Sequence, residues 1–310
     1  MFQYSIGENM RQIIFVLNTL ALLIVSCTLS YATDKPVVFV SIMPQKFFVE
    51  QIAGDLVDIQ VMVKPGASPA TYEPKVSQMK KLAVSDIYFA IGVPFERAWL
   101  ARIAGVNSQM KIVRTDRGID KLLMEKHLHQ EEHGQEDQIH KGHGKSYHGG
   151  LDPHIWLSPH LVSKQAAVIA ASLEDLIPEK AAVFASNLVL FQEKIETLDA
   201  ELHRILAGKE DLRFMVFHPS WGYFAKNYHL KQIPIEIEGK GAKSSQLREL
   251  ILYARSEGIK VIFAQPQFSR KSARLIAREI DGQVITVDPL AEDWLENMKI
   301  VAEKFREAVQ

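Results

Sequence analysis

Two histidines and one aspartate stand at positions in the sequence where a metal ion can be bound. His218 directly follows the apolar run RFMVF, and Asp288 directly follows QVITV, so each comes where a predicted strand ends. His154 lies in DPHIWLSP, just before a predicted helix. Ligands of open α/β sheets bind beyond the carboxyl ends of the strands, and zinc and related ions accept imidazole and carboxylate. The three residues therefore predict a metal site.

Six further histidines lie in a polar segment that precedes His154. The segment is rich in Glu, Gln and Gly and has no apolar periodicity, which is typical of disordered chain. Imidazoles on a flexible tether bind divalent ions weakly, and less well below their pKa of ~6.5. Two interpretations stay open, a loop that collects metal or senses occupancy and a solvated spacer. The six residues are His127, His129, His133, His140, His143 and His148.

Strands and helices alternate in two separate parts of the chain. The runs PVVFVSI, VDIQVMV, DIYFAIG and MKIVRTD predict buried strands between helices, and the same alternation resumes at RFMVF. Between these parts, residues 158–208 are almost entirely helical in pattern, with one long helix beginning at Pro178. Alternation at this spacing favours parallel sheets covered on both faces. We therefore predict an α/β protein with two Rossmann-like lobes bridged by a long helix.

These patterns divide the chain into four parts. Residues 1–32 are predicted to be a signal peptide, and residues 33–160 the first lobe, which includes the His-rich loop 126–150. Residues 161–208 form a helical linker and residues 209–310 the second lobe. The metal site is expected in the cleft between the lobes, because the candidate ligands come from both.

The N-terminal part has the features of a secretory signal. The apolar run from Ile13 to Val25 follows Arg11 and is too short for a membrane span. Cleavage after Ala32 is the favoured interpretation, and cleavage before Cys27, which would leave a lipidated cysteine, is the alternative. Both predict an exported protein in the periplasm or another extracytoplasmic space. Cys27 is the only cysteine, so an intrachain disulfide is excluded.

Five motifs, taken in order, resemble the landmarks of one family. They are PGASPATYEP, DPHIWLSP, FHPSWGYFAKNY, IEGKGAKSSQLREL and VDPL. The chain from about Lys35 onward resembles the zinc/manganese solute-binding proteins of metal ABC importers (cluster A-I), of the zinc-uptake type with a His-rich loop. The resemblance implies His154, His218 and Asp288 as ligands of an ion held between the lobes. It also implies an ABC permease as partner, and we expect a monomer.

The nature of the ligands and the charge of the chain narrow the choice of partner. Histidine rather than glutamate at position 218 favours Zn²⁺ over Mn²⁺, because manganese prefers oxygen ligands. The formal net charge is −1, and the sequence has no basic block. This argues against nucleic acid as a partner.

One position departs from the family pattern. The first loop of the family carries Pro-His-x-Tyr, whereas this chain has Ala70 at the place of the histidine. Three arrangements would complete the ligand shell: a water molecule, a histidine of the 126–150 loop such as His143 or His148, or a carboxylate. The candidate carboxylates are Glu73 and Glu238. A tyrosine, Tyr72, is expected to hydrogen-bond one of the ligands without binding the ion itself. Two tryptophans near the histidines, Trp156 and Trp221, are expected to wall the cleft.

Two other functions compete with a metal receptor. A His-His-Asp site with an open water position would also suit an exported zinc-dependent hydrolase. The mature sequence contains no H-E-x-x-H, G-x-S-x-G or phosphate-binding Gly-rich motif, which disfavours an enzyme. A surface adhesin or a metal buffer on the same fold is the second alternative, and the sequence does not separate it from a receptor.

Overall fold

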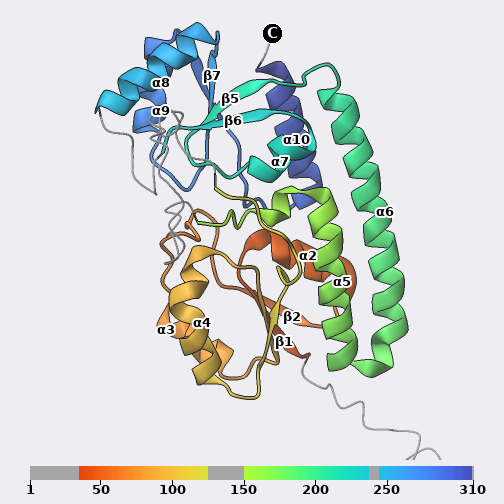
Figure 1. The fold of residues 1–310 in the computed structure, drawn as a ribbon. Helices are drawn as coiled ribbons and strands as arrows, with labels where there is room; N and C mark the ends of the chain where they lie inside the picture. The colour runs from red at the N-terminus through yellow and green to blue at the C-terminus, as the bar shows by residue number, and fades with distance from the viewer. Residues whose placement is uncertain (1–34, 125–149, 237–243, 309–310) are drawn as a thin grey trace, which may run out of the picture. The chain divides into compact units, whose positions relative to one another are not determined.

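The computed structural model describes residues 35–124, 150–236 and 244–308. The chain from Pro36 onward forms one compact unit. Two four-stranded sheets lie within it, both of them parallel throughout. The predicted α/β class is therefore confirmed (Figure 1).

The first sheet has the strand order β2-β1-β3-β4. Its central strands, β1 and β3, are runs of buried apolar residues, as expected for strands covered on both faces. Prolines in the first turn start α2 and α4, where the missing N–H is not needed. The elements are β1 (Val37–Val40), α2 (Met43–Ala53), β2 (Asp58–Val61), α3 (Val76–Leu82), β3 (Ile87–Ala90), α4 (Pro94–Val106) and β4 (Lys111–Arg114).

A helical stretch connects the two sheets. It consists of the 3₁₀ turn η1 (Ile155–Leu157), α5 (Pro159–Leu176), the 3₁₀ turn η2 (Pro178–Lys180) and α6 (Ala181–Leu206). The 26 residues of α6 give it a length of about 39 Å. The long helix was expected to begin at Pro178, but Pro178 starts the short turn η2 instead, and α6 begins only at Ala181.

The second sheet has the order β6-β5-β7-β8 and so repeats the topology of the first. In each sheet the chain moves from its first strand to one neighbour and then returns to the other side. Such a reversal of direction creates a crevice at the carboxyl ends of the strands. The elements are β5 (Arg213–Val216), α7 (Gly222–Asn227), β6 (Lys231–Pro234), α8 (Ser244–Ser256), β7 (Val261–Ala264), α9 (Lys271–Glu279), β8 (Gln283–Thr286) and α10 (Trp294–Glu307).

One hydrophobic core runs through both sheets and the helices between them. Helix α6 packs against α2, α5 and α10, and Figure 1 shows it lying alongside α5. The Phe48 ring of α2 lies 5.4 Å from Trp294 of α10, centroid to centroid, and Phe305 of α10 lies 4.5 Å from Phe214 of β5. A smaller second core fills the space beneath α8 and α9. The shared core fixes how the strand ends of the two sheets face each other.

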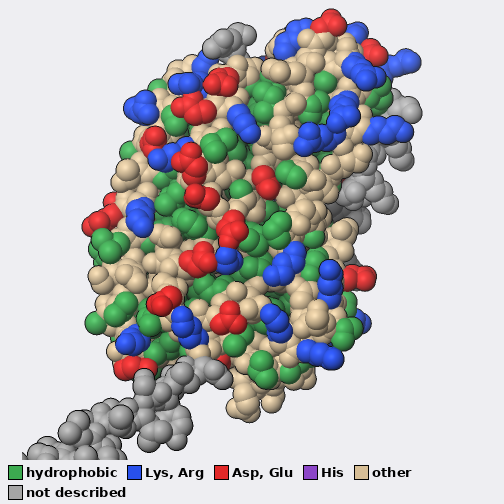
Figure 2. All heavy atoms as spheres, turned by 180° about the vertical axis from the view of Figure 1, so that it is seen from behind, with side chains coloured by type: hydrophobic (Ala, Val, Ile, Leu, Met, Phe, Trp, Pro, Cys, Tyr) green, Lys and Arg blue, Asp and Glu red, His purple; other side chains and the backbone are tan. Residues whose placement is uncertain are grey.

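The surface seen in Figure 2 carries acidic and basic side chains interspersed over most of its area, with Lys and Arg gathered towards the end formed by α8 and α9. Mixed charge of this kind agrees with a net charge of −1. Within the described ranges, no helix combines the length and apolarity that a membrane crossing requires.

Truncation of one aromatic residue in this core should strongly lower the stability of the protein. Phe305 is fully buried and packs on Phe214, Phe224 and Phe263. Phe305→Ala should lower the free energy of unfolding by about 3–5 kcal/mol, through lost burial and the cavity left behind. Leu190→Ala, at a half-exposed position on α6, serves as the control in urea denaturation and should change it by less than about 1 kcal/mol. Equal losses in the two variants would contradict the packing of Phe305 in the core.

Candidate metal centre

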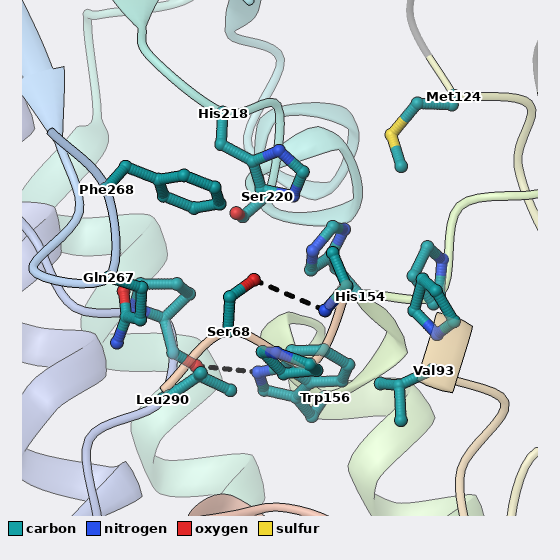
Figure 3. A pocket seen from close by; sticks show the side chains of 15 residues that line it. Ser68, Val93, Met124, His154, Trp156, His218, Ser220, Gln267, Phe268 and Leu290 are labelled. Atoms are coloured by element: carbon teal, nitrogen blue, oxygen red, sulfur yellow. Dashed lines mark hydrogen bonds between the residues drawn. The ribbon is translucent and has the colours of Figure 1, made fainter. Parts of the chain in front are cut away.

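A small pocket lies where the carboxyl ends of the two sheets meet (Figure 3). The first sheet contributes the loops that follow β2 and β3 and the segment from β4 to η1, which carries His154. The second sheet contributes the loops that follow β5, β7 and β8. The walls of the pocket are mainly apolar, so few polar groups of the wall compete with a bound ion for the side chains that could coordinate it. The lining residues that matter most are Ala70, His154, Trp156, His218, Gln267 and Phe268.

The pocket brings together two of the three predicted ligands, His154 and His218. The centroids of their imidazole rings are 5.3 Å apart, at an interplanar angle of 72°. His154 precedes η1, and His218 follows β5, as the sequence predicted. Only 9% and 16% of the two side chains are exposed, respectively, so an ion bound between them would lose most of its water.

Each imidazole is oriented by a carboxylate behind it. The Nδ1 atom of His154 lies 2.7 Å from Oδ1 of Asp152, and Nδ1 of His218 lies 2.7 Å from Oε1 of Glu236. An ionised carboxylate only accepts hydrogen bonds, so each Nδ1 carries a proton, and in a neutral ring Nε2 is then the nitrogen with the lone pair. This is the usual arrangement around histidines that bind metals.

Sequence analysis missed both carboxylates, although signals for them exist. Asp152 stands two residues before His154 in the same motif, and Glu236 stands two residues after the end of β6. The rule that selected His218, a polar residue just past a strand end, also selects Glu236.

Burial favours the neutral form of the first histidine. It lowers the pKa of the His154 imidazole, an effect that the neighbouring Asp152 carboxylate opposes. Histidine binds metals in its neutral form, so burial favours the competent state.

Backbone contacts hold both histidines in place. Gln265, which is completely buried after β7, accepts a hydrogen bond from the His218 N–H at 3.2 Å and donates one to its carbonyl at 2.6 Å. Asp152 Oδ1 also accepts from the His154 N–H at 2.9 Å, and the Tyr223 hydroxyl donates to the Asp152 carbonyl at 3.0 Å. The imidazoles thus sit on anchored backbone.

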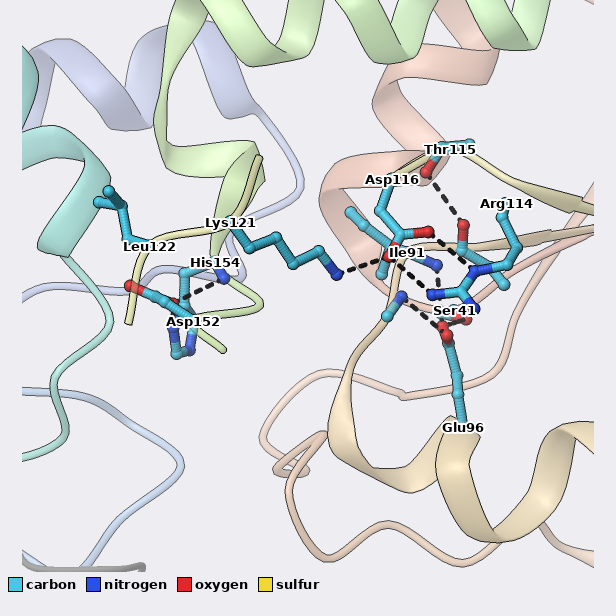
Figure 4. A network of polar contacts seen from close by, with 12 residues as sticks. Ser41, Ile91, Glu96, Arg114, Thr115, Asp116, Lys121, Leu122, Asp152 and His154 are labelled. Atoms are coloured by element: carbon cyan, nitrogen blue, oxygen red, sulfur yellow. Dashed lines mark hydrogen bonds and ion pairs between the residues drawn. The ribbon is translucent and has the colours of Figure 1, made fainter. Parts of the chain in front are cut away.

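A buried polar network supports the first-sheet wall of the pocket (Figure 4). The carboxylate of Glu96 accepts hydrogen bonds from Ser41 Oγ at 2.6 Å and from the backbone N–H groups of Ile91 and Gly92 at 3.0 and 2.8 Å. Burial raises the pKa of Glu96, and these donors oppose that rise. The network fixes the turn from β3 into α4, which brings Val93 to the pocket.

Aromatic rings pack against both imidazoles. Trp156 lies 5.1 Å from His154 and Phe268 lies 4.8 Å from His218, centroid to centroid. Trp156 therefore walls the pocket, as expected, and its Nε1 donates to the Pro289 carbonyl at 2.7 Å. The expectation for Trp221 is wrong: it is fully buried and packs on Phe224 and Phe305 in the core.

The third predicted ligand, Asp288, does not line this pocket. It lines an adjacent cavity together with Lys64, Gly66 and Glu292. Its Oδ1 accepts hydrogen bonds from Gln267 Nε2 at 2.8 Å and from the Leu290 N–H at 2.9 Å. Within the described residues, no three His, Cys, Asp or Glu side chains are grouped so that they could hold an ion.

The remaining candidates fall into two groups. Ala70 lines the pocket, where the family has its first histidine, whereas Glu73 is exposed and the Tyr72 hydroxyl donates to Gln78 Oε1 at 2.6 Å. The others lie outside the described residues: Glu238, His127, His129, His133, His140, His143 and His148.

Two parallel-sheet lobes on a long helix, with paired histidines between their strand ends, match what the sequence led us to expect of a metal-binding solute-binding protein. The chain belongs to the ZnuA family, described as the periplasmic component A of the zinc-uptake complex, whose model matches residues 38–308. The fold and the family are those of binding receptors and not of enzymes.

Solved structures and curated proteins agree with this assignment. A crystal structure of ZnuA is 40% identical, with a TM-score of 0.79 over 88% of this chain and 99% of that one. A ZnuA deletion mutant with zinc bound is also 40% identical, with a TM-score of 0.78 over 89% and 98%. Zinc-binding protein AdcA of Streptococcus pyogenes is 27% identical over 84% of this chain and 51% of its own length. The chain thus spans about half the length of the AdcA proteins.

If the two carboxylates orient the histidines, their replacement should lower the affinity for zinc. Asp152→Asn and Glu236→Gln keep the side-chain volume but remove the charge that fixes the imidazole. Each should weaken zinc binding about 10–100-fold, as measured by competition with a chelator. Asp199→Asn is the matched control, since Asp199 lies beside the exposed His203 on α6, outside the pocket. Wild-type affinity in both Asp152→Asn and Glu236→Gln would refute this role.

Proposed function

We propose that this protein is an extracytoplasmic receptor that captures zinc and delivers it to an ABC permease for uptake. His154 and His218 bind the ion through their Nε2 atoms, and Asp288 is the third protein ligand. The observation that carries the proposal is the facing pair of imidazoles, each with its Nδ1 held by a carboxylate.

The chemistry of the pocket favours zinc over manganese. Zinc accepts imidazole at about 2.0–2.1 Å and is satisfied by four ligands. Manganese prefers carboxylate, carbonyl and water oxygens, whereas the two groups that face each other here are imidazoles. The family's zinc-uptake description and the zinc-bound ZnuA mutant support the same choice.

Asp288 joins the ion only if its side chain leaves the adjacent cavity. Its backbone need not move far, since the Asp288 residue directly precedes Pro289, and Pro289 itself lines the histidine pocket. Rotation of the side chain is therefore the movement that we propose. A carboxylate there would also offset part of the positive charge of the ion.

The position left open by Ala70 is filled by water in our proposal. Three protein ligands and a water form an ordinary zinc shell. A histidine of the 126–150 loop, such as His143 or His148, is the alternative fourth ligand. This open position should make the ion easier to release than one held by four protein groups.

The proposed location and partner are supported by the family. The family is that of a periplasmic component of an uptake complex, which supports an extracytoplasmic location and a transporter as partner. We propose that residues 1–32 are removed as a signal. The zinc-binding lipoprotein AdcA of Streptococcus pneumoniae, 27% identical over 91% of this chain and 56% of its own length, supports the alternative of a lipid anchor at Cys27.

The alternative functions have less support. A zinc hydrolase needs a general base beside the metal-bound water, but in the described part of the chain the only ionisable side chains that line the pocket are the two histidines. The laminin-binding protein of Streptococcus agalactiae shares the fold, with 22% identity, a TM-score of 0.74 and coverage of 89% of this chain and 100% of that one. At this identity the likeness concerns the fold alone.

Removal of either histidine tests the proposal directly. His154→Ala and His218→Ala should each weaken zinc binding at least about 100-fold, because each removes one ligand of a shell with few protein ligands. Titration calorimetry with a competing chelator measures this on residues 33–310. His203→Ala, at an exposed helix position, is the control and should bind as the wild type does.

Two outcomes would contradict the proposal. Tight one-to-one zinc binding by either variant would show that the ion lies elsewhere. Zinc-dependent hydrolysis of a simple ester by the wild type, lost in His218→Ala, would favour the hydrolase.

A further inference from the structure

Two residues, Gln267 and Leu290, lie between the histidine pocket and the cavity that holds Asp288. Gln267, in the loop after β7, lines both spaces, as does Leu290. His154 and His218 line only the first space, and Asp288 lines only the second. Figure 3 shows the Gln267 side chain in the wall on the side of Phe268 and Leu290. Gln267 is therefore placed to control whether the carboxylate reaches the ion.

The hydrogen bonds fix the orientation of the Gln267 amide. Its Nε2 donates to Oδ1 of Asp288 at 2.8 Å. A carboxylate cannot donate, so the amide must present its nitrogen to Asp288 and cannot be turned over. The Oε1 atom is consequently left without a hydrogen-bond partner among the described residues, although it is buried. The amide thus keeps its hydrogen bond to Asp288 while its own oxygen stays buried without one in the described part of the chain.

The backbone of Asp288 is anchored independently of Gln267. Asn297 of α10 donates to the Asp288 carbonyl at 2.8 Å, and the preceding Val287 is buried. Loss of the Gln267 contact would thus free the carboxylate without displacing the loop. Among the described residues, the other hydrogen bond to that carboxylate comes from the Leu290 N–H, which donates to the same oxygen, Oδ1.

We propose that Gln267 is a positioning residue that holds Asp288 back from the metal and so sets how tightly zinc is kept. This rests on the proposed function, in which Asp288 is the third ligand. The ion must compete with the Gln267 amide for the carboxylate, so the hydrogen bond reduces the net gain of coordination. A group that restrains one state lowers the affinity of a ligand that requires the other. A receptor restrained in this way binds its cargo but can still release it.

Replacement of Gln267 by methionine tests the restraint, because methionine has similar length but no donor. Gln267→Met should raise zinc affinity about tenfold, the value of a typical hydrogen bond to a charged group, and should slow zinc dissociation. Gln60→Met is the matched control: Gln60 also donates to an aspartate, Asp58 at 2.9 Å, on the edge strand β2. It should leave both quantities unchanged.

A double-mutant cycle shows whether Gln267 acts through Asp288. In an Asp288→Ala background, Gln267→Met should have no effect on zinc affinity. The visible spectrum of bound Co²⁺ reports the ligands of the ion. It should change in the Asp288→Ala variant and stay unchanged in Gln60→Met, a pattern that a general loss of structure would not produce.

The outcomes separate the inference from the proposed function. An unchanged or lower affinity in Gln267→Met, or the same gain in both backgrounds, would overturn the inference alone. If Asp288→Ala binds zinc like the wild type, the third-ligand assignment fails, and the role of Gln267 fails with it. Loss of tight binding only in the histidine and Asp288 variants would leave the proposed receptor in place.

Discussion

The proposed metal centre depends on the hydrogen bonds that two carboxylates accept from the Nδ1 atoms of two histidines. Without Asp152 and Glu236, each imidazole could rotate or exchange its proton between nitrogens. With them, both rings are fixed and both Nε2 atoms are free to coordinate. The apolar walls strengthen each polar interaction in the pocket, because little water competes there. The pocket is thus suited to an ion that accepts nitrogen ligands, as we propose.

The rest of the fold holds these two histidine–carboxylate pairs at a fixed distance from each other. His154 and His218 belong to different sheets, so their separation depends on how the sheets are joined. The common core of α2, α6 and α10 makes that joint, and Trp156 adds polar links across it. Its Nε1 donates to Pro289, and its carbonyl accepts from Trp294 Nε1 at 2.7 Å. A movement between the lobes would have to break these bonds, whereas a side-chain change at Asp288 would not.

Periodic features of the sequence were sufficient for the fold and for part of the site. Alternating strands and helices predicted the two parallel sheets, and strand ends selected His218 correctly as a pocket residue. Asp288 was selected by the same rule, yet it lies in the next cavity, because Gln267 and Leu290 bind its carboxylate. The contact with Gln267, which is 21 residues away in the sequence, leaves no periodic signal. Trp221 was misplaced for a similar reason: proximity to His218 along the chain does not reveal that the ring turns into the core.

The most direct test of the account counts the imidazoles bound to zinc. X-ray absorption at the zinc edge distinguishes nitrogen ligands of histidine from water and carboxylate oxygens. We expect two imidazoles in the wild-type protein and three in Ala70→His, since Ala70 lines the same pocket as His154 and His218. Three or more imidazoles in the wild type would show that a histidine from the 126–150 loop completes the shell. An equal count in both proteins would place the ion away from this pocket.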